Sequence, residues 1–410
     1  MKHPRSPLAP RNPALPRPVR GLRLATLKSG IRYQGRDDLL LAAFDASTSV
    51  AGVFTQTLAA AAPVAWCRKA LKRGKAAALL VNAGNANAVT GKAGDAIVQA
   101  SVQAVAKALS RKAGEVFVAS TGIVGRPMAR LVLAEKVPPI AARLSRATSQ
   151  GFVKAAGAIR TTDTFPKWAS RTAKIGGKKV AISGFCKGSG MIAPHMATLL
   201  AFVFTDAAIP SAMLQKLLNE GVNKSFNCIT VDSDTSTNDT LLLFATGAAK
   251  NKKPAGAGLK AFKKALDEVL MELAQLVVKD GEGAQKFISI EVRGAASDMA
   301  AQRIGLTIAN SPLVKTAIAG EDANWGRILA AAGRSGEKIN IRQAGVSMGG
   351  VAICRNGQQL KHYDERPVAR HLKGRDIRIL VEAGVGKGRA RVWTCDLTHG
   401  YIDINASYRS

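Results

Sequence analysis

The chain has 410 residues, of which 59 are Lys or Arg and 28 are Asp or Glu, so its formal net charge is +31. Hydrophobic residues make up 47% and charged residues 21% of the sequence, which excludes a mostly disordered chain or a fibrous repeat and indicates a sizeable core. The uncharged stretch 46–67 is interrupted by Pro63 and several hydroxyl residues, so we expect no membrane span.

The chain opens with a basic segment that contains six prolines within residues 1–18 and no acid within the first 36. Proline disfavours helices, and we predict a disordered basic tail over residues 1–20. The segment has no apolar run with a cleavage site, so it does not look like a secretion signal. The five cysteines are widely spaced and form no C-x-x-C pair, which argues against disulfides or a zinc site and favours a cytoplasmic protein.

Short apolar runs then alternate with glycine-containing loops and helical patterns. The expected strands are 76–81, 116–119, 179–185, 198–205, 287–292, 377–382, 391–396 and 401–405. The expected helices are 95–109, 211–223 (with Ser211 as N-cap) and 258–278, and Asn356-Gly357 predicts a hairpin. This alternation predicts a layered α/β fold with two intimately packed halves.

The high charge raises the hypothesis of a nucleic-acid-binding protein, since basic surfaces bind phosphates through counterion release. Aromatic residues are only 5% and are not interleaved with the basic ones, as base stacking requires. We therefore expect no nucleic-acid partner and interpret the charge as a solvated surface that attracts anionic substrates. A basic nucleic-acid-binding protein stays as the alternative from another class.

An aspartate motif, Asp232-Ser233-Asp234-Thr235, follows a short apolar run. The spacing D-x-D-x-T is similar to that of phosphoryl-transfer enzymes in which one aspartate is the nucleophile. Here the motif lies in the middle of the chain and the threonine comes one position too early. We favour a polar loop that satisfies its own backbone.

Residues 187–198 read KGSGMIAPHMAT, which is not a phosphate-binding P-loop because no Gly-Lys-Ser/Thr follows. The run closely resembles the self-cleavage segment of the ornithine acetyltransferase family, the glutamate N-acetyltransferases of arginine biosynthesis. Further blocks of the family occur in the same order, and the resemblance spans roughly residue 52 to the C-terminus. These blocks are 161–167, 235–240, 280–284, 310–317, 324–328 and 405–410.

The resemblance implies an α/β fold of the ornithine acetyltransferase/aminopeptidase type and a precursor that cleaves itself between Ala197 and Thr198. The products would be an alpha chain, with its globular part over 21–197, and a beta chain, 198–410. Two alpha and two beta chains would assemble into a heterotetramer.

The new terminal Thr198 would be the catalytic nucleophile. Its α-amine titrates near 7.7–8.0, so it can take the proton of the neighbouring hydroxyl, which is otherwise a weak nucleophile. By resemblance, Thr198 takes the acetyl group from N-acetylornithine and passes it to glutamate, without a metal or cofactor. The sequence leaves open whether acetyl-CoA also serves as donor. The alternative within this chemistry is an N-terminal-nucleophile amidase or aminopeptidase, in which water accepts the acyl group.

The resemblance also assigns the remaining site residues. The oxyanion hole matches Thr121 and Gly122 at the end of a predicted strand. The substrate-binding positions are Thr161, Lys187, Thr198, Glu282, Asn405 and Ser410. The choice between Thr161 and Thr162 stays open, as does which of Lys187 and Glu282 meets the tail of the substrate. The chain departs from the family pattern at His195, Gln285 and Gly400.

Overall fold

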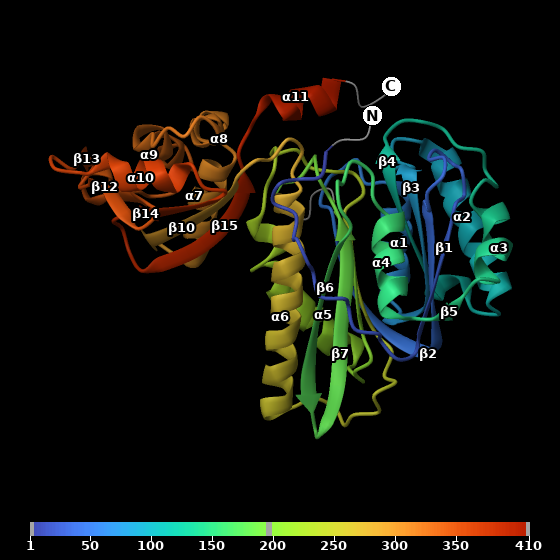
Figure 1. Cartoon of the computed structure of the whole chain (residues 1–410). Coiled ribbons are helices and arrows are strands. Elements are labelled where there is room, and N and C mark those ends of the chain that lie inside the picture. Colours follow the sequence, from blue (N-terminus) through green and yellow to red (C-terminus); the bar gives the residue numbers. More distant parts are fainter. Residues whose placement is uncertain (1–3, 194–198, 407–410) are drawn as a thin grey trace.

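The computed structural model describes residues 4–193 and 199–406, which form two β-sheets covered by helices (Figure 1). The nine-stranded sheet and α1–α6 make up the body of the molecule. The six-stranded sheet and α7–α10 make up a second lobe beside it. The predicted α/β class is therefore confirmed.

The nine-stranded sheet has the central order β4-β3-β2-β9-β8-β7-β6, with β1 paired to β2 and to β5. Its strands are β1 (Leu22–Leu27), β2 (Leu39–Phe54), β3 (Lys75–Asn85), β4 (Val116–Ile123), β5 (Ser145–Arg146), β6 (Lys167–Ile175), β7 (Lys178–Lys187), β8 (Leu200–Thr205) and β9 (Thr240–Ala245). Most neighbours are antiparallel, but β3 with β4 and β8 with β9 are parallel. The strands β8 and β9, which follow the predicted cleavage site, lie between β2 and β7, which precede it.

Helices cover both faces of this sheet (Figure 1). They are α1 (Ala62–Leu71), α2 (Gly91–Ala108), α3 (Val137–Ala141), α4 (Ser149–Ala158), α5 (Ser211–Val222) and α6 (Gly256–Lys279). Successive strand residues point to opposite faces. Phe202 and Phe204 of β8 accordingly pack in the core with α2 and α4, whereas Ala201 and Val203 pack in the core with α5 and α6. The continuous apolar runs of β8 and β9 reflect this burial on both sides.

The second lobe has the strand order β13-β12-β11-β14-β10-β15. Its elements are β10 (Phe287–Ala295), α7 (Asp298–Ala309), α8 (Pro312–Ala319), α9 (Trp325–Gly333), β11 (Gly345–Met348), β12 (Val351–Arg355), β13 (Gln358–Gln359), α10 (Glu365–Leu372), β14 (Asp376–Glu382) and β15 (Gly388–Cys395). Among the described residues, an isolated β-bridge between Ile229 and Trp393 links the body to β15, and one hydrophobic core runs from α5 and α6 into this lobe. Short 3-10 turns occupy Ala113–Glu115, Ala134–Lys136, Phe226–Cys228 and Ile341–Gln343.

Most expected elements are present, including the hairpin between β12 and β13. Asn356 and Gly357 have φ values of 53° and 71°, as a type I′ turn requires. The expected strand 401–405 is wrong, because this segment belongs to helix α11 (His399–Ala406). Its tertiary contacts, described below, override the strand preference of its Tyr and Ile residues.

The structure also differs from the expected disordered tail. Residues 4–20 lie along the body: the Ser6 amide donates to Thr164 Oγ1 (2.9 Å), and Trp168 Nε1 donates to the carbonyl of Ala14 (2.8 Å). The prolines do prevent a helix here, but they also favour an extended chain that can lie along a surface. We call residues 4–20 the N-terminal strap.

Within the described ranges, none of the helices combines the length and the apolar character that a membrane span requires. The same residues contain no group of three or more His, Cys, Asp or Glu side chains arranged to hold a metal ion. All five cysteines are buried and free.

Candidate active site

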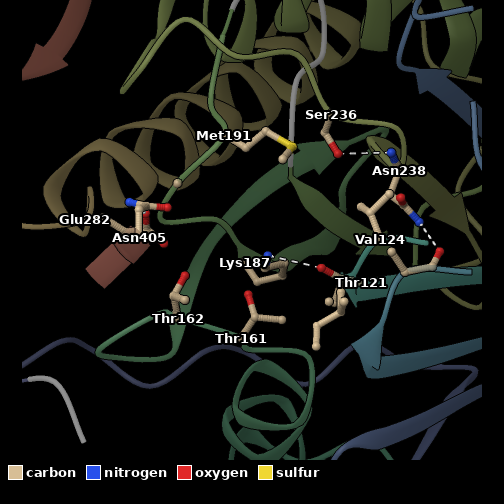
Figure 2. Close-up of a pocket in the computed structure, with 14 residues that line it drawn as sticks. Thr121, Val124, Thr161, Thr162, Lys187, Met191, Ser236, Asn238, Glu282 and Asn405 are labelled. Atoms are coloured by element: carbon tan, nitrogen blue, oxygen red, sulfur yellow. Dashed lines mark hydrogen bonds between the residues drawn. The ribbon is translucent and has the colours of Figure 1, made fainter. Parts of the chain in front are cut away.

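A cavity of about 250 Å³ opens where the carboxyl ends of β4 and β7 meet the loop after α6 and the helix α11 (Figure 2). It is lined by Ala86, Thr121, Gly122, Ile123, Val124, Thr161, Thr162, Lys187, Gly190, Met191, Ser236, Asn238, Glu282 and Asn405. Polar groups from segments far apart in the sequence therefore converge on one small space. Such convergence is typical of a binding or active site.

The structure brings six of the predicted site residues together in this cavity, namely Thr121, Gly122, Thr161, Lys187, Glu282 and Asn405. The cleavage residues Ala197 and Thr198, the departure at His195 and the terminal Ser410 lie outside the described residues. The chain is described again from Leu199, and Leu200 pairs with Lys187 across β7 and β8. The first described residues after the predicted cleavage site thus lie beside a cavity-lining strand, and the catalytic roles stay predictions.

Lys187 and Thr121 face one another across the floor of the cavity (Figure 2). Lys187 Nζ donates to Thr121 Oγ1 at 3.2 Å. Since the hydroxyl oxygen accepts here, its own proton can be donated to another group, such as a developing oxyanion. Burial lowers the pKa of Lys187 below its ordinary value, although Asp163 acts in the opposite direction.

Gly122 occupies a position that no other residue type fits. Its φ is +132°, and a Cβ added there would lie 2.2 Å from the carbonyl carbon of Gly84 on the neighbouring strand. Glycine is the residue that tolerates both this dihedral angle and this close backbone approach. Gly122 thereby lets β4 lie close against β3 at the point where it lines the cavity.

Glu282 lies on the opposite side of the cavity, beside Asn405 (Figure 2). Asn405 Nδ2 donates to Glu282 Oε2 at 2.8 Å, which ties α11 to the loop after α6. A Cβ on Gly190 would lie 2.3 Å from the same oxygen, so glycine makes room for the carboxylate. Burial raises the pKa of Glu282, while the hydrogen bonds from Asn405 and Thr162 oppose that rise.

Three buried charged side chains, Asp163, Lys167 and Asp280, form an ion triad next to the segments that line the cavity. Lys167 Nζ donates to Asp163 Oδ1 (2.6 Å) and to Asp280 Oδ2 (2.5 Å), and all three side chains are fully buried. Asp163 also accepts the amides of Thr161 (3.0 Å) and Gly188 (2.8 Å). Burial alone would raise the pKa of Asp163, but Lys167 and Lys187 outweigh it and hold this pKa below its usual range. The triad thus fixes two cavity-lining segments to the end of α6.

Sequence reasoning missed several residues of the cavity wall: Ala86, Ile123, Val124, Gly190, Met191, Ser236 and Asn238. Asn238 Nδ2 donates to the carbonyls of Ala86 (2.6 Å) and Ser120 (2.8 Å), so it joins the polar loop to the end of β4. In the sequence, the position of Asn238 within the polar run 235–240 was the only feature that pointed to it. Thr161 and Thr162 both line the cavity, so the open choice between them stays open.

The aspartate motif does not line the cavity. Asp232 instead accepts backbone amides from the neighbouring segment that precedes residue 194, as described further below. The expected polar loop is therefore present. The carboxylate of Asp232, however, accepts amides of another segment as well as an amide of its own loop. This hydrogen bonding leaves Asp232 poorly placed for phosphoryl transfer.

An α/β protein with a buried lysine, a hydroxyl donor and a close-approach glycine in one cavity has the groups expected of an acyl-transfer enzyme. The family model described as "ArgJ family" matches residues 23–410. A curated relative from Gluconobacter oxydans, named arginine biosynthesis bifunctional protein ArgJ, is 52% identical over 99% of this chain and 96% of its own length. The chain therefore belongs to the ArgJ family.

Two solved structures are also similar. The arginine biosynthesis bifunctional protein from Bacillus halodurans is 40% identical and covers 50% of this chain and 98% of its own, with a TM-score of 0.49. An ornithine acetyltransferase from Mycobacterium tuberculosis is 33% identical and covers 44% of this chain and 94% of its own, with a TM-score of 0.38. The expectation of an acyltransferase of arginine biosynthesis is confirmed by the family assignment, which favours it over the nucleic-acid-binding alternative.

Proposed function

We propose that this enzyme cleaves itself between Ala197 and Thr198 and then transfers the acetyl group of N-acetylornithine to glutamate. The observation that carries the proposal is the convergence of Thr121, Gly122, Lys187 and Glu282 on one cavity, where Lys187 pairs with Leu200 of the neighbouring strand β8. Membership of the ArgJ family and the motif 187–198 support it.

Self-cleavage is an N-to-O acyl shift followed by hydrolysis. The hydroxyl oxygen of Thr198 attacks the carbonyl carbon of Ala197, the peptide C–N bond breaks, and the nitrogen keeps the proton that the hydroxyl gives up. Water then hydrolyses the resulting ester. The products are a carboxylate on Ala197 and a Thr198 that has both a free amine and a free hydroxyl.

Acetyl transfer uses both groups of that residue. In the first half-reaction the amine takes the hydroxyl proton as the oxygen attacks the acetyl carbonyl of N-acetylornithine, and the same proton leaves with the ornithine nitrogen. In the second half-reaction the amine of glutamate attacks the acetyl ester, and a proton returns to the threonine oxygen. The Thr121 hydroxyl and the Gly122 amide would stabilise the oxyanion of both tetrahedral intermediates.

The cavity offers opposite charges for two substrates with opposite tails. Glu282 suits the ammonium group of ornithine, and Lys187 suits a carboxylate. Both side chains are buried, so a bound charge would interact with them at a lower effective dielectric than in water. One site can thereby accept first the ornithine derivative and then glutamate.

The assembly and the donor range are part of the same proposal. The two cleaved chains stay together and pair into a heterotetramer of two alpha and two beta chains in the cytoplasm. The reaction needs no cofactor, and acetyl-CoA serves as a second acetyl donor. The word "bifunctional" in the name of the Gluconobacter relative supports a second reaction.

The test combines intact mass with an activity assay. We expect the purified protein to consist of two fragments that meet at Ala197 and Thr198, and Thr198→Ala to stay a single chain. With N-acetylornithine and glutamate, the cleaved enzyme should form N-acetylglutamate and ornithine in equal amounts. Cutting of Thr198→Ala at the same bond would refute self-cleavage, and ornithine release without N-acetylglutamate would favour an amidase.

A further inference from the structure

The loop 232–239, which leads into β9, carries an aspartate at each of its ends, half-buried Asp232 and fully buried Asp239. Neither aspartate lines the cavity, and the reaction proposed above uses neither. Both nevertheless contact the segments that border residues 194–198.

Asp232 holds the segment that precedes this site. Its Oδ2 accepts the amide of Met191 at 2.6 Å, and its Oδ1 accepts the amide of Ile192 at 2.8 Å. The carbonyl of Ile192 in turn accepts the amide of Val231 at 2.8 Å. Met191 has a φ of +59°, a left-handed conformation that a residue with a side chain adopts only when its surroundings enforce it. The two hydrogen bonds that the carboxylate of Asp232 accepts hold this conformation in place.

Asp239 holds the segment that follows the site. Its side chain is fully buried, and Oδ1 accepts the amide of Leu199 at 2.6 Å. The carbonyl of Leu199 accepts the amide of Thr240, the next residue along, at 3.1 Å. Among the described residues, Asp239 Oδ2 is buried and has no hydrogen-bond partner. Both backbone groups of Leu199 are therefore fixed by two consecutive residues of one loop end.

We propose that Asp232 and Asp239 are positioning residues for self-cleavage, which hold the chain before and after the Ala197–Thr198 bond at a fixed separation. The inference rests on the proposed function. Both anchors belong to one short loop, so the separation of Ile192 from Leu199 is set by the backbone of that loop. Residue 198 is bonded to Leu199, and fixing the Leu199 amide restricts where the nucleophile can lie relative to the carbonyl that it attacks.

The two aspartates differ in what they require of a replacement. Asp232 accepts an amide on each oxygen, so Asp232→Asn would direct an NH₂ group at one of two N–H donors. Asp239 accepts the Leu199 amide on one oxygen only, and burial raises its pKa well above the ordinary value, which favours the neutral acid. Asparagine has the shape of that neutral acid and keeps one acceptor oxygen. The isosteric change should therefore be harmful at 232 and tolerated at 239.

The test measures how fast the folded precursor is converted into two fragments. The full chain is synthesised in a cell-free system, synthesis is stopped, and intact masses are followed over time, with circular dichroism and thermal unfolding to define the folded fraction. We expect Asp232→Asn and Asp239→Ala to slow cleavage by about 10–100-fold, because displaced reacting groups lose that order of rate. Asp239→Asn should restore the rate to within about threefold of wild type, since the remaining acceptor corresponds to one hydrogen bond.

The matched control is Asp234→Asn, an exposed aspartate of the same loop, which should cleave at the wild-type rate. Each cleavage rate is measured on folded protein only. If either Asp232→Asn or Asp239→Ala fails to fold, the other variant still tests the positioning role. Wild-type rates in folded Asp232→Asn or folded Asp239→Ala would overturn the positioning role while leaving self-cleavage intact. A wild-type chain that is never cut between Ala197 and Thr198 would instead refute the proposed function itself.

Discussion

Lys187 pairs a buried ammonium group with a neutral hydroxyl, which is an unusual way to place a charge inside a protein. Its Nζ donates to Thr121 Oγ1, while the nearby Asp163 carboxylate is committed to Lys167 and to two backbone amides. Burial of a lysine without a dedicated carboxylate costs free energy, and such costs are typically found at functional sites. We therefore expect Lys187 to serve the chemistry and not the stability of the fold.

Lys187→Met should lower kcat for acetyl transfer by about 10²–10³, the usual cost of losing one oxyanion-stabilising contact. The Thr121 hydroxyl would lose the donor that orients it, while a methionine of similar length would fill the space. Steady-state kinetics and thermal unfolding together check this expectation. The control is Lys178→Met, an exposed lysine at the start of the same strand β7. An unchanged kcat in folded Lys187→Met would contradict the role.

Asp239 gives the stability of the fold a definite pH dependence. Burial raises its pKa well above the ordinary value. At pH values between the ordinary pKa, which applies to the unfolded chain, and the raised pKa of the folded chain, the folded chain binds more protons than the unfolded chain. This group therefore makes the free energy of unfolding fall as pH rises. Asp239→Asn has no proton to bind there. Its free energy of unfolding should improve relative to the parent from about pH 4 upward, by at most about 1.4 kcal/mol per pH unit.

Chemical unfolding at several pH values checks this expectation. Both proteins should carry Thr198→Ala, so that uncut chains are compared. The same series on Asp234→Asn serves as control, because that side chain is exposed. A constant difference between Asp239→Asn and its parent across the pH range would show that Asp239 ionises normally in the folded chain.

Residue by residue, the sequence predicted the chemical groups of the site better than its walls. Gly122 and Lys187 were identifiable because a family motif carries them, and their neighbours in the chain are distinctive. Met191 and Ser236 line the cavity through loop conformations that no local pattern reports. The partners of Asn238 lie 152 and 118 residues away in the sequence, so its contacts follow from the fold alone.

At the scale of elements, the errors occur where tertiary contacts outweigh local preference. In α11, Tyr401 and Asn405 lie four residues apart and therefore on one face of the helix. From that face Tyr401 donates to Asp232 Oδ2 (3.2 Å) and Asn405 donates to Glu282. In a strand the same two residues would also share a face, but about 13 Å apart instead of the about 6 Å of one helical turn. The core strands β8 and β9 were predictable because burial on both faces leaves a plain apolar run.

The N-terminal strap links the start of the chain to the cavity. Ser6 donates its amide to Thr164 Oγ1, and that hydroxyl donates to Asp280 Oδ1 (2.5 Å) in the buried ion triad. The Ser6 hydroxyl also donates to the carbonyl of Lys279 at 2.6 Å. The strap thus supports the same triad that fixes the cavity-lining segment at Thr161.

Deleting residues 1–16 should lower the thermal midpoint by a few degrees, about what the loss of 1 kcal/mol causes in a protein of this size. It should also raise KM for N-acetylornithine several-fold, because the loop after α4 loses one of its supports. Asn12→Ala, an exposed position in the same strap, is the control and should change neither quantity. An unchanged midpoint and KM after the deletion would mean that the strap has no structural role.

At the scale of the whole molecule, the two predicted chains interleave in one sheet. Strands β8 and β9 come from residues after the cleavage site and pair with β7 and β2 from residues before it. Their side chains also fill both hydrophobic cores. Separating the chains would break the centre of the sheet, not an interface between finished domains.

We therefore expect the cleaved chains to elute together from a gel-filtration column in native buffer and to unfold in one cooperative transition. Intrinsic fluorescence and far-ultraviolet circular dichroism should report the same denaturant midpoint. Thr198→Ala supplies the uncut reference. Elution of free alpha and beta chains without denaturant, or two separate midpoints, would contradict an interleaved sheet.

The central place of β8 and β9 also bears on how such a protein can be made. Two halves translated from separate genes would each present long unpaired strand edges, which invite aggregation before the partner arrives. A single polypeptide keeps the missing strands within reach during folding, at the high local concentration of a tether. Cleavage of the connecting peptide bond after folding would remove no strand pairing from the assembled sheet. Synthesis as one polypeptide, followed by cleavage, is therefore less prone to aggregation than synthesis as two separate chains.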